Sequence, residues 1–126
     1  MKDLSGSLVF YSILPKWFLP EPSFHRIARF SPIIGMLIAI IEIVIWLGLY
    51  TIGWNHIATI LIVIAFNACI TGGLHLDGLI DTADGLAAGK DKYREAMRDS
   101  RIGASGLNAL IIIILIQVAS LINLKI

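Results

Sequence analysis

The chain is 126 residues long and carries a formal net charge of +1, with 57% hydrophobic and 15% charged residues. Soluble domains have roughly 45–50% apolar and about 25% charged residues, so a soluble monomer of this length would leave much of its apolar surface in water. The composition therefore predicts a small integral membrane protein or part of one, and the near-neutral charge argues against a nucleic-acid partner.

Three apolar segments follow one another along the chain, at residues 32–54, 57–76 and 106–124. About 20 helical residues cross a hydrocarbon core of about 30 Å, so we predict three transmembrane helices. The fold class expected is all-α, a polytopic membrane helical bundle forming one domain over residues 1–126. The middle segment needs its polar edge, residues 67–76, to reach full length, and it also fits a buried or re-entrant segment.

Glu42 is the one ionisable residue inside the first apolar segment. An acid at the centre of a membrane helix costs about 2.5–3.5 kcal/mol on insertion scales. We therefore expect Glu42 to face other helices and to pair there, with Asn67 or with a residue outside this chain.

The basic residues are distributed asymmetrically about the predicted spans. Nine of the ten lie either before the first span or between the second and third: Lys2, Lys16, Arg26, Arg29, Lys90, Lys92, Arg94, Arg98 and Arg101. The tenth, Lys125, follows the third span. By the positive-inside rule, the N-terminal segment 1–31 and the loop 77–105 face the cytoplasm, as expected of a multi-pass protein of the cell inner membrane.

Six of the nine acidic residues lie between Asp77 and Asp99. Asp77, Asp81 and Asp84 are spaced i, i+4 and i+7, so on a helix they point within about 60° of one another. Such a face suits a hard divalent cation such as Mg²⁺, which is bound by one or two carboxylates together with substrate phosphates. The alternative is a solvated acidic face just outside the membrane. The glycines that follow, Gly78 and Gly85, are interpreted as room for a ligand to approach the backbone.

A basic counterpart with the same spacing comes next. Arg94, Arg98 and Arg101 would form a stripe of guanidinium groups if residues 93–101 are helical, and Arg binds diphosphate through paired hydrogen bonds. Basic residues near a span are also expected from topology alone, where they meet anionic lipid. The acidic and basic groups together favour metal-assisted phosphoryl or nucleotidyl transfer at the membrane surface.

Three segments resemble a known family. GGLHLDGLIDTADGL at residues 72–86 and MRDSRIGASG at residues 97–106 are similar to the membrane-bound cobalamin synthases, also called adenosylcobinamide-GDP ribazoletransferases. FSPIIGMLIA at residues 30–39 resembles that family's entry into the first span, with Ser31 where Phe is more usual. Family members are longer, with further spans after the third, so the chain resembles the N-terminal half of such an enzyme.

The resemblance implies a reaction late in vitamin B12 assembly. Adenosylcobinamide-GDP is joined to α-ribazole, or to its 5′-phosphate, and GMP leaves. The implied ligands of Mg²⁺ are Asp77, Asp81 and Asp84, one of which would accept the hydroxyl proton. The implied substrate-binding residues are Arg94, Arg98, Asp99, Ser100, Arg101 and Gly103. Membrane lipid is an expected partner, and a homo-oligomer stays open.

His75 is a second candidate for the proton acceptor. On a continuous helix it lies about 160° around the axis from Asp77, so it joins the aspartate face only if the helix breaks near Gly72 and Gly73. A general base and a histidine bound to a backbone carbonyl or to water at the interface are both open interpretations.

Two alternative functions are weighed against the resemblance. A CDP-alcohol phosphotransferase also clusters aspartates and glycines at a membrane surface, but its motif continues Asp-Gly with Ala-Arg, whereas Leu86 and Ala87 follow here. A divalent-cation carrier or a non-catalytic membrane protein could hold the same acids. Transport predicts ionisable residues at mid-membrane in several spans, and only Glu42 meets that description.

Overall fold

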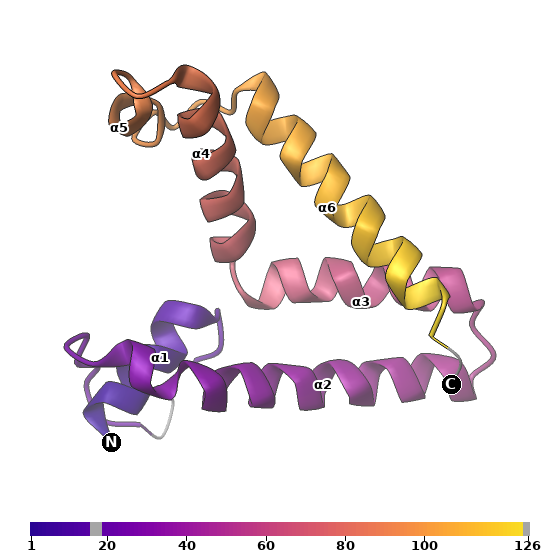
Figure 1. The fold of residues 1–126 in the computed structure, drawn as a ribbon. Helices are drawn as coiled ribbons and strands as arrows, with labels where there is room; N and C mark the ends of the chain where they lie inside the picture. The colour runs from indigo at the N-terminus through magenta and orange to yellow at the C-terminus, as the bar shows by residue number, and fades with distance from the viewer. Residues whose placement is uncertain (16–18, 125–126) are drawn as a thin grey trace. The chain divides into compact units, whose positions relative to one another are not determined.

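The structure, a computed structural model, describes residues 1–15 and 19–124. Every regular element within these residues is helical: α1 (Lys2–Tyr11), the 3-10 helix η1 (Ile27–Phe30), α2 (Ser31–Thr51), α3 (His56–Ile70), α4 (Leu74–Ala88), α5 (Tyr93–Ala96) and α6 (Ala104–Ile122). The helices form two compact units, Met1–Gly73 and Leu74–Ile126 (Figure 1). Lys16 and Lys125, used in the prediction of topology, lie outside the described residues.

In the first unit, α2 and α3 form an antiparallel hairpin and run side by side (Figure 1). Pro32 stands in the first turn of α2, where its missing N–H costs no hydrogen bond. The helix ends at Thr51, three residues before the predicted limit, because Gly53 adopts a left-handed φ of 82°. Asn55 begins α3, its side-chain oxygen accepting the backbone N–H of Ile57 at 2.9 Å.

Helix α1 is an element that the sequence analysis left within an undivided N-terminal segment. It contributes Leu8 to a small apolar core with Ile34 and Ile38 of α2 and Ile70 of α3. A methyl group at Gly6 would collide with the carbonyl oxygen of Ser23, so glycine permits this close approach. The N-terminal helix thus packs at the end of the hairpin where α2 begins and α3 ends.

The predicted second span, residues 57–76, is interrupted in the structure and is not one continuous helix. Helix α3 ends at Ile70 and α4 begins at Leu74. Gly72 and Gly73 have φ angles of 61° and 72°, and their N–H groups bond back to the carbonyls of Cys69 at 3.0 Å and Ala68 at 2.8 Å. This hydrogen-bond pattern is a Schellman motif, which ends a helix because L side chains other than glycine rarely adopt such angles.

In the second unit, α4 packs against both α5 and α6. Helix α6 starts beside the end of α4 (Figure 1). The predicted loop 77–105 is therefore partly helical, since most of α4 and all of α5 lie within it. The third predicted span is confirmed as a helix and shifted by two residues at each end, from 106–124 to Ala104–Ile122.

Two helical segments are long and apolar enough to cross a membrane, Ile27–Thr51 and Ala104–Ile122, or three if α3 and α4 together make one broken span. Much of their apolar surface is exposed, as shown by Met36, Ile43 and Val44 on α2 and by Ile112 and Leu115 on α6. Soluble proteins rarely expose apolar patches of this extent. The all-helical membrane fold predicted from composition is thus confirmed.

Candidate functional site

The acidic residues singled out from the sequence lie on one helix. Asp77, Asp81 and Asp84 all belong to α4, whose continuous helical course gives them the shared face that their spacing predicts. Asp77 is exposed, whereas Asp81 and Asp84 are half-buried. Within residues 1–15 and 19–124, no three side chains of His, Cys, Asp or Glu are arranged to hold a metal ion.

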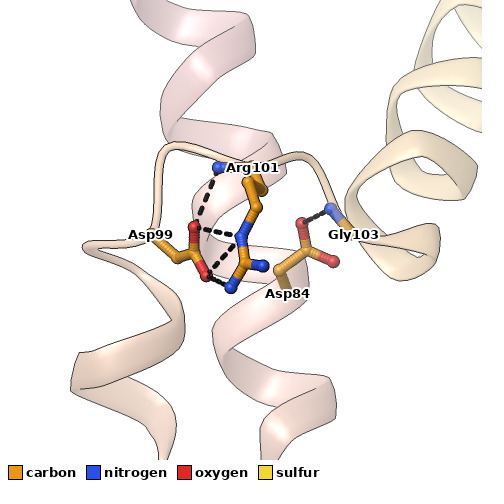
Figure 2. A network of polar contacts seen from close by, with 4 residues as sticks. All are labelled: Asp84, Asp99, Arg101 and Gly103. Carbon is orange, nitrogen blue, oxygen red and sulfur yellow. Dashed lines mark hydrogen bonds and ion pairs between the residues drawn. The ribbon is translucent and has the colours of Figure 1, made fainter.

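The carboxylate of Asp84 is engaged in a way that the sequence analysis missed. One oxygen, Oδ2, accepts the backbone N–H of Gly103 at 2.8 Å, and the other, Oδ1, accepts that of Gly106 at 2.8 Å. Figure 2 shows the first of these bonds, which joins α4 to the start of α6. Gly103, expected to bind substrate, thus donates its N–H to the protein itself.

The predicted stripe of three arginines on one helix is wrong. Helix α5 ends at Ala96, so only Arg94 is helical, and Arg98 and Arg101 follow in the turns beyond it. The backbone N–H of Arg101 donates to Oδ1 of Asp99 at 3.0 Å. This bond closes an Asx turn, which competes with helical hydrogen bonding and takes the chain off the helix axis.

Asp99 and Arg101 also form an ion pair through their side chains (Figure 2). Arg101 donates from Nε to Oδ1 at 3.0 Å and from Nη2 to Oδ2 at 2.6 Å. The side-chain and backbone hydrogen bonds from Arg101 lower the pKa of Asp99 to about 2, and the same carboxylate raises the pKa of Arg101. The guanidinium group is 87% exposed, so it faces solvent while Asp99 fixes its orientation.

The remaining candidates are Ser100, Arg98 and His75, all of them exposed. Ser100 is exposed between the two partners of the ion pair, and Arg98 is exposed just before them. His75 lies in the first turn of α4, after the break at Gly72 and Gly73, so the helix is continuous from His75 to Asp77 and keeps the two about 160° apart. The break therefore does not bring His75 to the aspartate face.

A pocket of about 470 Å³ opens beside the end of α4. Its lining includes Lys90, Asp91, Tyr93 and Arg94. These residues offer two positive charges, one negative charge and an aromatic side chain next to the helix that carries the aspartates.

Gly85 allows close packing against α4 and also lines the pocket. A methyl group there would lie 2.7 Å from Cγ of Met97 and 3.0 Å from the ring of Tyr93. Gly78, in contrast, has open space around the position of a side chain. The missing side chain at Gly85 lets α5 and the turn after it rest on α4.

The fold and the site together define a helical membrane protein with a polar segment. That segment carries carboxylates on α4 and, later in the chain, the arginines of α5 and of the turns after it. The chain belongs to the cobalamin-5-phosphate synthase family, whose model matches residues 3–126. The family resemblance carried by residues 30–39, 72–86 and 97–106 is thereby confirmed.

Relatives in several genera bear the name adenosylcobinamide-GDP ribazoletransferase. The protein of Prochlorococcus marinus (strain MIT 9313) is 49% identical over 124 residues, covering 98% of this chain and 48% of the relative. That of Trichormus variabilis is 37% identical over 120 residues, covering 94% and 48%. That of Clostridium botulinum (strain Loch Maree) is 43% identical over 99 residues, covering 77% and 40%. The chain thus spans about half the length of these relatives, and no solved structure gives a significant match.

Proposed function

We propose that the full-length protein containing this chain is a membrane-bound cobalamin synthase. It joins adenosylcobinamide-GDP to α-ribazole, or to the 5′-phosphate of α-ribazole, and releases GMP. The observation that carries the proposal is the second unit, in which a helix bearing carboxylates packs against the segment that bears Arg94, in a chain with relatives named for this substrate and transfer.

The proposed reaction forms one phosphodiester bond and breaks one bond of a diphosphate. The ribose hydroxyl oxygen attacks the phosphorus attached to cobinamide, and the bond from that phosphorus to the oxygen bridging to GMP breaks. GMP leaves with the bridging oxygen, and the hydroxyl proton passes to a base. The protein must therefore neutralise the diphosphate, orient the hydroxyl group and accept one proton.

Mg²⁺ is the cofactor that the acidic face would take. Asp77 and Asp81 are one helical turn apart on α4, which suits a cation that uses one or two carboxylates and completes its shell with phosphate oxygens and water. Bound there, Mg²⁺ would offset the charge of the diphosphate. Asp84 differs from the other two aspartates because its oxygens accept the N–H groups of Gly103 and Gly106, which tie it to the start of α6. We therefore assign the metal to Asp77 and Asp81 and not to all three expected ligands.

The arginines are assigned to the phosphates. Asp99 occupies the Nε and Nη2 edge of Arg101, which leaves the Nη1 donors of an exposed guanidinium for a phosphate oxygen. Arg94 and Arg98, both exposed, add positive charge along the same segment, and Ser100 offers a hydroxyl group beside Arg101. We assign the proton to a carboxylate of the aspartate face, with His75 as the alternative acceptor.

The polar segment and the N-terminus are proposed to face the cytoplasm, in the cell inner membrane. Nine of the ten basic residues fall on that side of the predicted spans, which supports this orientation by the positive-inside rule. Substrates would then reach the aspartate face from the cytoplasm, beside membrane lipid.

The test is GMP release by membranes containing the full-length protein, supplied with adenosylcobinamide-GDP, α-ribazole and Mg²⁺. We expect chelation to stop release and added Mg²⁺ to restore it. Asp81→Ala should lower the rate about 10²-fold or more, whereas Asp3→Ala in α1 serves as the acidic control that keeps the rate. If His75→Ala releases GMP at a rate near that of the wild type, the proton acceptor is one of the aspartates and not His75. No release by the wild type, or an unchanged rate in Asp81→Ala, would refute the assignment.

A further inference from the structure

Two adjacent residues near the end of α4 contact three later parts of the chain. The carboxylate of Asp84 accepts N–H groups from Gly103 and Gly106, which lie 19 and 22 residues further on. Next to it, Gly85 is buried against Met97 and Tyr93. The segment between α4 and α6 thus contacts α4 in its middle, at Tyr93 and Met97, and at its C-terminal end.

The hydrogen bonds of Asp84 replace a missing helix cap. The first turn of a helix has N–H groups with no partner inside the helix, and a side chain at the N-cap position usually accepts one of them. The N-cap of α6 is Gly103, which has no side chain to do so. Asp84 accepts two such N–H groups from another helix, and its charge is favourable at the positive end of the helix dipole.

The fit depends on glycine at both positions. A methyl group at Gly103 would collide with the Asp84 carboxylate, and one at Gly106 would lie 2.5 Å from Oδ2 of Asp84 and 2.7 Å from Cγ2 of Ile80. Gly106 is also buried. The start of α6 therefore reaches α4 only because neither residue carries a side chain.

We propose that Asp84 is a positioning residue and not a metal ligand. Its carboxylate fastens α6 to α4, and with Gly85 it holds the loop of residues 89–103 on the helix that carries Asp77 and Asp81. The arginines of that loop are thereby kept within reach of a phosphate held at the aspartates. The effect on kinetics rests on the proposed function, whereas the attachment itself does not.

The attachment is tested by hydrogen–deuterium exchange of the backbone amides in the full-length protein. Asp84→Ala should speed exchange at Gly103 and Gly106 by about tenfold or more, because hydrogen bonds to a charged acceptor are lost. Asp84→Asn should speed exchange less, because the asparagine side chain keeps one acceptor oxygen and has an NH₂ donor where the second carboxylate oxygen was. Gly106→Ala should speed exchange at Gly103 with every carboxylate retained. Gly48→Ala, with open space around it in α2, is the control.

Measurements of metal binding and kinetics distinguish the two roles of Asp84, positioning residue and metal ligand. We expect Asp84→Asn and Gly106→Ala to leave Mn²⁺ binding, measured by electron paramagnetic resonance, at the wild-type affinity. Both should raise KM for adenosylcobinamide-GDP more than they lower kcat, and the double variant should be no worse than the more severe single one. A general loss of folded protein would lower kcat instead.

Unchanged exchange at Gly103 and Gly106 in Asp84→Ala would overturn the proposal, as would weaker Mn²⁺ binding in Asp84→Asn together with normal binding in Gly106→Ala. If Asp84→Ala does not fold, Asp84→Asn and Gly106→Ala decide the same question. If the wild type releases no GMP, the proposed function fails, and the exchange measurement still decides the role of Asp84.

Discussion

The ion pair between Asp99 and Arg101 is a local structure made by residues two positions apart. One carboxylate accepts both the backbone N–H and the guanidinium of Arg101. Both hydrogen bonds favour the charged form of Asp99, which explains the pKa of about 2. The pKa of Asp99 is lower in the folded protein than in the unfolded chain. The ion pair therefore stabilises the folded protein at pH values above the unfolded pKa, and this stabilisation is lost as the pH falls toward 2. At neutral pH the guanidinium therefore stays oriented.

The titration of Asp99 checks this contact directly. We expect a midpoint of about 2 in the full-length protein, measured by NMR on the side-chain carboxyl carbon. Arg101→Gln should return the midpoint toward the ordinary value of 3.8, since the guanidinium donors are lost. Arg98→Gln is the matched control and should leave it unchanged. A wild-type midpoint near 3.8 would contradict the pair.

At the scale of the elements, a polar contact joins α2 to α3. The side-chain amide of Asn67 donates to Oε1 of Glu42 at 2.5 Å. This confirms the expected pairing of Glu42 with Asn67, and it explains how an acid is tolerated within the first span.

A double-mutant cycle measures this bond. Asn67→Leu should destabilise the full-length protein by about 0.6 kcal/mol, the mean for side-chain hydrogen bonds between membrane helices, and by no more than about 1.7 kcal/mol. Glu42→Gln keeps an acceptor oxygen and should cost less. Ser120→Ala, whose hydroxyl group bonds only within α6, is the control. Strictly additive effects of Asn67→Leu and Glu42→Leu on the free energy of unfolding would show that the two residues do not interact.

At the scale of the whole molecule, the distribution of basic residues predicts which side of the membrane the polar segment faces. In a Cys69→Ser background, a cysteine at Lys92 should react with an impermeant reagent only after intact cells are opened. A cysteine at Ile52, 70% exposed after α2, should react from outside. Labelling of position 92 in intact cells would reverse the orientation.

The sequence was informative wherever a property depends on residues close together in the chain. Long apolar segments predicted the helices α2 and α6, and the spacing of the aspartates predicted their common face on α4. Sequence reasoning did not find the end of α5, where the N–H groups of Arg98 and Asp99 bond three residues back in tight turns, before the Asx turn from Asp99 to Arg101. It also missed α1, whose place depends on apolar contacts with Ile34, Ile38 and Ile70 far along the chain.

The sequence by itself determined that this chain is a helical membrane protein of the family suggested by its polar motifs, because hydropathy and residue spacing are local and additive. Only the tertiary structure decided what Asp84 contacts. The other two aspartates, Asp77 and Asp81, lie on the same face of α4. The difference arises from N–H groups that two glycines at the start of α6 bring to Asp84. A carboxylate's role depends on the donors that surround it, and those donors come from residues 19 and 22 positions away.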